Sequence, residues 1–359
     1  MKPQYTFDEL FSDETRRGTK IPASAYKTKG KYPIIDQGKG TIAGYTDEAE
    51  GLFTDVPAII FGDHTRIVKY VDVPFFIGAD GVKILSVKKA KDNPKYFFYA
   101  LKNARIPDTG YNRHFKWLKE QKFLRPAIDE QNSIVERLDA TLHLINNTES
   151  QLVKLDALVK SRFIEMFGDL PLSCAMKDVC KIITDGTHQP PKFVREGIPF
   201  IFVSNIVQDR LTYDAEKYID DVTYSELVKR TPIEIGDVLL STVGSYGHAA
   251  VVENERKFLF QRHIAYLKPD REKINSRFMH ALLLSDGVQR QIESKVKGIA
   301  QKTLNLSEIK CLQIPLPSLP HQNQFADFVT QADKSKLAIR KLLEKQELLR
   351  ASLMQEYFG

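Results

Sequence analysis

The sequence predicts an α+β protein in which two mixed α/β globules alternate with two long helices that pair as an antiparallel intramolecular coiled coil. Two observations predict this arrangement. Residues 126–168 recur without a gap as residues 317–359, at an offset of 191, and an internal repeat is a strong guide to architecture. The segments 1–125 and 169–316 contain short strand-like stretches between turn residues. We therefore expect a first globule, a central helix, a second globule and a distal helix, in that order.

Composition narrows the class of protein. Apolar residues make up 42% of the 359 residues and charged residues 27%, as in globular proteins. No apolar run reaches the roughly 18 residues of a membrane span, and the first ten residues lack the regions of a signal peptide. Cys174, Cys180 and Cys311 are an odd number without CxxC spacing, which argues against disulfides and zinc and predicts a cytoplasmic protein. The net charge of +6 permits nucleic-acid binding without showing it.

In the first globule, the apolar stretches 58–61 and 82–87 predict strands. The turns beside such strands carry polar, basic and aromatic side chains, which are the types that hold phosphates and contact base edges. Each turn by itself is more typical of an ordinary connection between strands. The candidates for DNA contact in this globule are Tyr45, His64, Thr65, Arg66, Tyr111, Asn112, Arg113 and His114.

The central helix is predicted between Pro126 and Gly168, because proline is favoured ahead of a helix and glycine just after one. An apolar residue recurs every seven positions along it, which is typical of a coiled-coil seam. About 35 residues at about 1.5 Å each would span roughly 50 Å. The seam residues are Leu138, Ile145, Leu152 and Val159.

The second globule has strand-like stretches at 199–203, 237–241, 249–252 and 264–267. Its turns repeat the polar and basic character of the first globule, and this recurrence favours DNA contact over a purely structural role. The candidates here are Thr187, His188, Gln189, Ser204, Asn205, Ser245, Tyr246, Arg262, Gln301 and Lys302.

The distal helix repeats the central one, including a leading proline, the pairs Gln131/Gln322 and Asn132/Asn323, and a closing Phe-Gly. Neither apolar seam can stay exposed, so the two helices are expected to pair antiparallel; the alternative is that each packs separately on its own globule. The distal seam residues are Val329, Ile339, Leu343 and Leu353, with Leu342 and Leu349 on a similar face.

The repeat is expected to extend upstream at an offset of 188, where Gly110 lies over Gly298. Arg113 and Lys302 then flank equivalent glycine turns and are the best paired candidates for DNA contact. The same alignment places Leu118, Glu120 and Lys122 over Leu306, Glu308 and Lys310.

Two catalytic motifs come close and are rejected. Asn93-Pro94-Lys95-Tyr96 approaches the motif of adenine-N6 methyltransferases, but lysine replaces a proline and no glycine fingerprint for a cofactor precedes it. Asp108, Glu120 and Lys122 fit a loose PD…ExK nuclease pattern that would hold Mg²⁺. In the second half Glu308 and Lys310 recur without the aspartate, so this pair indicates a surface feature of the repeat.

The chain resembles the specificity (S) subunits of type I restriction-modification systems. The resemblance rests on the helical repeat and on the order of several short motifs: Tyr32–Ile35, Gly44–Asp47, Ile60–Arg66, Gly78–Lys83, Asp185–His188, Gly197–Phe200, Gly236–Leu239, Gly244–Gly247 and Ile314–Pro317. One departure is the entry to the central helix, where Leu124-Arg125-Pro126 stands in place of the second half's Ile-Pro-Leu-Pro.

The resemblance implies a non-catalytic subunit with two target recognition domains, each reading one half of a bipartite site in double-stranded DNA. The helices would set the spacing and dock two methyltransferase subunits, which would bring S-adenosylmethionine. Motor-nuclease subunits would bring ATP and Mg²⁺, so that no cofactor is expected in this chain. The alternatives are a single-chain Mg²⁺-dependent endonuclease and a coiled-coil adaptor that binds only proteins.

Overall fold

The computed structural model describes residues 3–78, 81–110, 112–298 and 302–359. These residues form two compact units, one made of residues 1–149 and 341–359 and the other of residues 150–340. Both long helices therefore contribute one part to each unit. None of the helices described in these ranges is long and apolar enough to cross a membrane.

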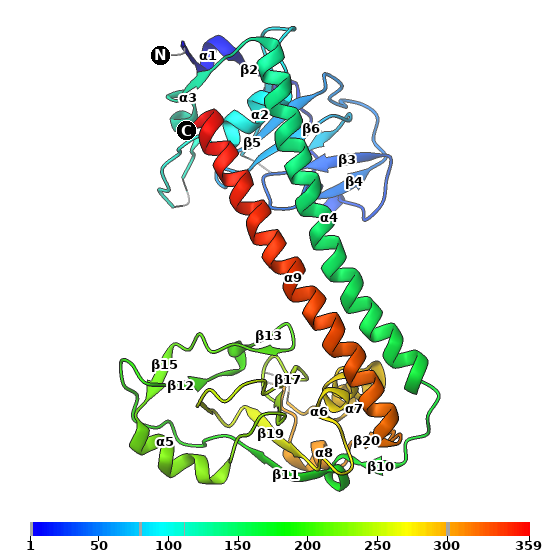
Figure 1. Cartoon of the computed structure of the whole chain (residues 1–359). Coiled ribbons are helices and arrows are strands. Elements are labelled where there is room, and N and C mark those ends of the chain that lie inside the picture. Colours follow the sequence, from blue (N-terminus) through cyan, green and yellow to red (C-terminus); the bar gives the residue numbers. More distant parts are fainter. Residues whose placement is uncertain (1–2, 79–80, 111, 299–301) are drawn as a thin grey trace. The chain divides into compact units, whose positions relative to one another are not determined.

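The first unit contains a four-stranded antiparallel sheet in the order β2-β8-β5-β6 and a three-stranded sheet in the order β4-β3-β7, in which β3 and β7 run parallel (Figure 1). Strand β1 pairs with β9, so the beginning of the globule is hydrogen-bonded to its end. The elements are β1 (Gln4–Thr6), α1 (Phe7–Leu10), β2 (Phe11–Asp13), β3 (Tyr32–Ile35), β4 (Gly44–Thr46), β5 (Ala58–Gly62), β6 (Val68–Val71), β7 (Phe76–Ile77), β8 (Val82–Val87), α2 (Pro94–Lys102), α3 (Phe115–Lys119) and β9 (Lys122–Leu124).

The second unit repeats this topology. Its sheets have the orders β11-β19-β16-β17 and β15-β12-β18, again with one parallel pair, β12 and β18. Strand β10 pairs with β20 as β1 does with β9. The elements are β10 (Cys174–Ala175), β11 (Cys180–Asp185), β12 (Ile198–Ile201), β13 (Ile206–Val207), β14 (Arg210–Leu211), β15 (Lys217–Ile219), α5 (Asp221–Leu227), β16 (Val238–Ser241), β17 (Ala249–Val251), β18 (Leu259–Phe260), β19 (Ile264–Pro269), α6 (Ser276–Leu283), α7 (Asp286–Lys295), α8 (Leu306–Lys310) and β20 (Gln313–Ile314).

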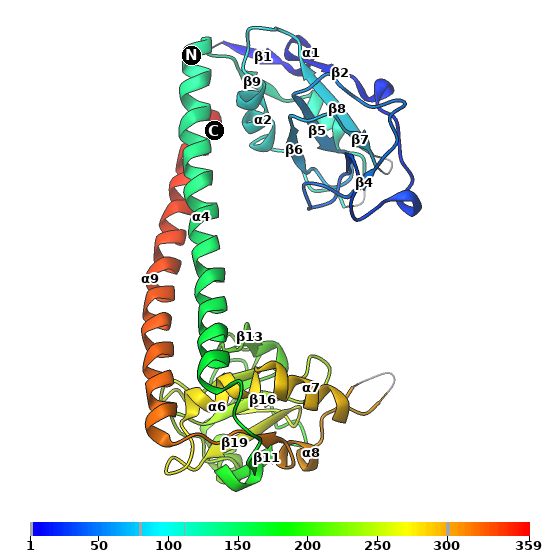
Figure 2. The same cartoon turned by 90° about the vertical axis from the view of Figure 1, so that its right-hand side faces the viewer.

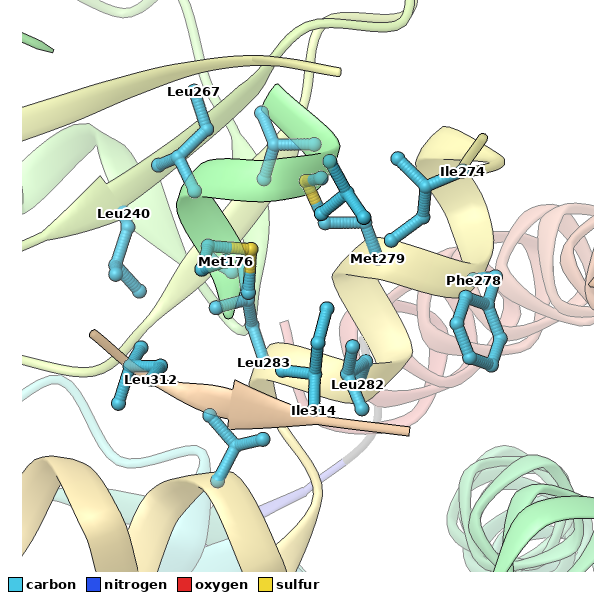
Figure 3. Packing of buried hydrophobic residues seen from close by; sticks show 14 of the residues in the cluster. Met176, Leu240, Leu267, Ile274, Phe278, Met279, Leu282, Leu283, Leu312 and Ile314 are labelled. Atoms are coloured by element: carbon cyan, nitrogen blue, oxygen red, sulfur yellow. The ribbon is translucent and has the colours of Figure 1, made fainter. Parts of the chain in front are cut away.

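The core of the second unit lies between its larger sheet and α6. Figure 3 shows Phe278, Met279, Leu282 and Leu283 of α6 gathered with Met176 and with Leu240 and Leu267 of the sheet. All of these side chains are at most 1% exposed, and burial of such side chains is the dominant favourable term in folding. In the first unit, α2 covers the corresponding face and contributes Tyr96 and Phe97 (Figure 2).

The two long helices are α4 (Ile128–Phe167) and α9 (Leu319–Phe358), each of 40 residues and thus about 60 Å long. In the first unit, Leu138 near the start of α4 shares a core with Leu353 near the end of α9. In the second unit, Phe163 near the end of α4 shares a core with Phe325 near the start of α9. The helices therefore run antiparallel, and the predicted pairing is confirmed.

The helix seam is apolar with polar interruptions. Leu138 and Ile145 are buried. The other predicted seam residues are half-buried: Leu152, Val159, Val329, Ile339, Leu343 and Leu353. The expectation for Leu342 and Leu349 was wrong, because both are nearly half exposed. A heptad places only two positions of seven in the seam, and these two leucines fall outside them.

Asn93-Pro94-Lys95-Tyr96 has a structural role. Asn93 caps the N-terminus of α2, where its side chain accepts a hydrogen bond from the Lys95 N–H and donates one to the Asn132 side chain. Asn275 caps α6 in the same way and donates to Asn323. The resemblance to a methyltransferase motif therefore reflects helix capping.

Candidate nucleic-acid interface

In the first globule two loops meet where β5 ends. The Arg66 guanidinium lies 2.7 Å from the Asp108 carboxylate, and His64 Nδ1 donates to the Asn112 carbonyl over 3.2 Å. The Gly110 N–H and then Arg66 hold the pKa of the Asp108 carboxyl below its usual value. Asp108 is therefore ionised, and its ion pair with Arg66 joins the two loops. The backbone of Arg66 lies in the left-handed region, at a φ of 60°.

His114 was a candidate for DNA contact, and the structure corrects this. Its side chain is 0% exposed, and its Nδ1 donates to the carbonyl of Asp63 over 3.0 Å. The Asp63 carboxylate in turn accepts the N–H of Phe115 at the start of α3. A residue enclosed in this way positions the loop, because a buried polar group must find its partners inside the protein.

The neighbouring surface is a groove lined by Thr109, Asn112, Arg113, Lys116 and Trp117. Asn112 and Arg113 were predicted candidates, whereas Lys116 and Trp117 were missed. The sequence could have indicated both residues, because the chain's single tryptophan stands between Lys116 and Lys119 directly after the candidate loop. Basic and aromatic residues side by side are a pattern of nucleic-acid contact.

Three candidates of this globule lie elsewhere or cannot be placed. Thr65 donates its hydroxyl to the Gln37 carbonyl. Tyr45 lies on β4, where it bridges to Lys27. Tyr111 falls outside the described residues, as does Gln301 of the second globule.

In the second globule, the loop after β16 meets the segment before α8. The Gly244 N–H donates to the Lys302 carbonyl over 3.2 Å, and the Lys302 ammonium lies 5.9 Å from the centre of the Tyr246 ring. Ser245 is exposed beside them. The structure thus brings three predicted candidates to one surface, with a cation, an aromatic ring and a hydroxyl.

A second cluster forms around β11. The Arg262 N–H donates to the Thr187 carbonyl over 3.1 Å, which joins two candidate loops. His188 Nε2 lies 2.8 Å from the Asp185 carboxylate, which also holds Arg230. The side chains of Arg262 and Gln189 are exposed.

Asn205 requires a correction as well. It is 5% exposed, and its side chain accepts the Phe202 N–H and donates to the Asp214 carbonyl. It therefore shapes its own loop, while the neighbouring Ser204 remains exposed.

The upstream repeat has a different register from the one expected. Helix α3 begins at Phe115 and α8 at Leu306, an offset of 191, so Leu118 matches Ile309. Glu120 and Lys122 then match Cys311 and Gln313, and the comparison with Glu308 and Lys310 was wrong. The loops before these helices differ in length, which produced the misleading offset.

The structure does not gather the residues of the nuclease pattern into one site. Asp108 is paired with Arg66, and Glu120 and Lys122 are exposed. Among the residues that the structure describes, no group of three or more His, Cys, Asp or Glu side chains is placed to hold a metal ion. In the second globule Glu308 pairs with Lys295 over 3.3 Å.

The family model of the type I restriction modification DNA specificity domain matches residues 5–155 and 174–350. The chain belongs to this family. The two matched ranges cover both globules and most of both long helices. It confirms the expected resemblance and the role of DNA-recognition subunit in place of a catalyst, and it contradicts the single-chain endonuclease and the protein-only adaptor.

Individual relatives agree. The type I restriction enzyme EcoBI specificity subunit of Escherichia coli is 23% identical over 320 residues, covering 76% of this chain and 67% of that protein. The MjaVIII specificity subunit of Methanocaldococcus jannaschii is 21% identical and covers 78% of this chain and 74% of that protein. A solved S subunit from M. genitalium has the same fold, with 18% identity, a TM-score of 0.61, and coverage of 100% of this chain and 96% of the other.

Proposed function

We propose that this specificity subunit reads a bipartite target in double-stranded DNA, one half with each globule, and that α4 and α9 set the number of unread base pairs between the halves. The observation that carries the proposal is the repeated sheet topology, which presents different side chains at matching places. Where α3 has Lys116 and Trp117, α8 has Ser307 and Glu308. A common scaffold with different surface residues suits the recognition of two different sequences.

The loops carry the chemistry of recognition. Arg113 in the first globule, and Arg262 and Lys302 in the second, would hold phosphates, while Asn112, Ser245 and Gln189 would contact base edges. We further propose the domain limits 1–125 and 169–316 for the recognition domains, and 126–168 and 317–359 for the helices.

We propose that two methyltransferase subunits dock on the long helices. Support comes from large apolar side chains that the helices leave open: in the second unit Val153 and Ile164 of α4 are 68% and 62% exposed, and in the first unit Leu348 of α9 is 71% exposed. A partner that covered these side chains would remove their apolar surface from water, which is favourable. One structure that resembles this chain (16% identity, TM-score 0.57) comes from work on complex assembly in a type I restriction-modification system.

The reactions then belong to partners. The methyltransferase subunits would bind S-adenosylmethionine, and motor-nuclease subunits would bind ATP and Mg²⁺, while this chain would hold none of these and would work in the cytoplasm. The expectation of a reducing compartment rests on the odd number and the spacing of the cysteines in the sequence.

The test is methylome sequencing of cells that express the chain with its methyltransferase subunits. We expect one methylated motif with two specified parts and a constant gap. Exchange of residues 169–316 for the matching globule of a relative should change one part only. A contiguous motif, or a change in both parts, would contradict the bipartite reading.

A smaller change tests the loop assignment. Lys302→Ala should weaken binding about equally for all sequences and lower the slope of log affinity against log salt by about 1, as expected for one lost phosphate contact. Lys310→Ala removes the same charge from an exposed position on α8 and is the matched variant. Equal slopes for the wild type and K302A would remove Lys302 from the interface.

A further inference from the structure

The groove beside α3 holds two cations, Arg113 and Lys116, for which the structure shows no ion pair with a described carboxylate. The Lys116 ammonium lies 4.2 Å from the centre of the Trp117 ring, and Arg113 lines the same groove. Within the described part of the chain, neither cation is within 4.0 Å of a carboxylate oxygen. The carboxylate on the adjoining loop, Asp108, is already neutralised by Arg66.

The groove is rigid at its base. Trp117 is half-buried, and its ring centre lies 5.4 Å from that of the fully buried His114. The backbone carbonyl of Trp117 accepts a hydrogen bond from the Gln121 side chain. The Asn112 side chain donates a hydrogen bond to the Thr109 carbonyl. A flat ring held in place below Lys116 and beside Arg113 suits an anionic chain with apolar sugar faces, because the ring itself loses little freedom on binding.

The matching surface of the second globule lacks this character. At the places of Lys116 and Trp117, α8 carries Ser307 and Glu308, and Glu308 is held by Lys295 and Lys297. The cation–ring pair on the helix itself is therefore specific to the first globule, since in the second globule the corresponding pair, Lys302 with Tyr246, comes from the segment before α8 and the loop after β16. The shared fold alone does not require it.

We propose that this groove is a DNA-backbone site: Arg113 and Lys116 neutralise phosphates, and the Trp117 ring packs against the adjoining deoxyribose. The inference rests on the proposed function and adds which helix of the first globule meets the DNA backbone. Trp117 is a positioning contact for the strand, and the sequence is read by other residues of the loops.

The first measurement is the salt dependence of duplex binding by the complex of this chain with its methyltransferase subunits. The double variant R113A/K116A should lower the slope of log affinity against log salt by about 1 to 2, the loss expected for one or two phosphate contacts. The matched variant K89A/K91A removes two exposed lysines of the same globule beyond the other end of β8 and should keep the wild-type slope. The methylated motif of R113A/K116A should be unchanged.

The second measurement uses the tryptophan directly. Since Trp117 is the only tryptophan of the chain, the emission of the wild-type complex minus that of a W117F complex belongs to this ring. Target duplex should quench this difference signal, and the quenching should be lost in R113A/K116A.

The outcomes separate this site from the proposed function. A wild-type complex that binds its target while the slope of R113A/K116A and the Trp117 emission stay unchanged overturns the backbone site and leaves bipartite reading intact. A changed methylation motif in R113A/K116A overturns the phosphate role in favour of base contact. A wild-type complex that fails to bind any duplex contradicts both proposals.

Discussion

At the scale of single residues, the repeat preserves two buried glutamines. Gln131 accepts the N–H of Asn93 and donates to the Pro126 carbonyl and to Asp92. Gln322 accepts the N–H of Asn275 and donates to the carbonyls of Pro317 and Lys273. Each glutamine thus ties the start of a long helix to the cap of the helix that covers its sheet.

Replacement of Gln131 by alanine should destabilise the first unit by about 2–4 kcal/mol, because several buried donors and acceptors lose their partner at once. The free energy of unfolding is measured by chemical denaturation. Gln151→Ala, at an exposed position of the same helix, should change it by no more than about 0.5 kcal/mol. Similar losses of unfolding free energy for the two variants would show that the hydrogen bonds of Gln131 contribute nothing beyond helix propensity.

His280 of α6 gives the second unit a pH dependence. Burial lowers the pKa of His280 below its ordinary value of 6.5 and outweighs its bonds to the carbonyls of Asp209 and Ala249 and the charge of Asp333, which raise it. As the pH falls through 6.5, His280 becomes protonated in the unfolded chain while it stays neutral in the folded chain. Stability is therefore fully present above that pH and declines below it.

We expect the melting temperature of the second unit to fall between pH 7.5 and pH 5.5 by less in H280Q than in the wild type. The exposed His143 on α4 supplies the matched variant H143Q, which should follow the wild type. Thermal melts at several pH values measure the effect. Parallel curves for H280Q and the wild type would refute it.

At the scale of elements, each long helix ends on an aromatic anchor. Phe167 at the end of α4 is 3% exposed and contacts the rings of Phe163, Phe278 and Phe325. Phe358, its counterpart on α9, is only half-buried and contacts Tyr96 at a ring distance of 5.2 Å. The closing Phe-Gly of the repeat therefore serves packing as well as helix termination.

Phe167→Ala should cost the second unit about 3–5 kcal/mol, the usual range for removal of a buried phenylalanine. Phe358→Ala should cost the first unit clearly less, because a half-buried ring loses less contact area. Denaturant unfolding of the two variants compares them directly. A larger loss for F358A than for F167A would contradict the packing described here.

At the scale of the whole molecule, two globules of one topology alternate with two helices of equal length. Equal length is needed when two antiparallel helices pair along their course, since a change in one alone would break the register of the seam. The proposed spacing role therefore depends on both helices together.

Insertion of one heptad into each helix, after Glu149 and after Arg340, should lengthen the unread gap of the target by about three base pairs, because seven residues rise about 10 Å and a base pair about 3.4 Å. Methylome sequencing reads the gap. The same insertion in α4 alone should abolish methylation by disturbing the seam. An unchanged gap with intact methylation in the double insertion would refute the spacing role.

The sequence alone determined the repeat, the two paired helices and the family. These features rest on local periodicity and on identical residues at one offset, such as Gln131 with Gln322. It could not determine which loop residues face outward. His114 and Asn205 have the composition of DNA contacts, yet the fold encloses them, because burial depends on segments far away in the chain.

Only the tertiary structure decided the common topology of the two globules and the register that matches α3 with α8. Strand pairing is set by long-range hydrogen bonds and shared core volume, which different sequences can satisfy equally well. The same long-range contacts placed Lys116 and Trp117 beside Arg113 in one groove. The helices could therefore be predicted from the chain by itself, while the surface proposed to meet DNA depends on the fold.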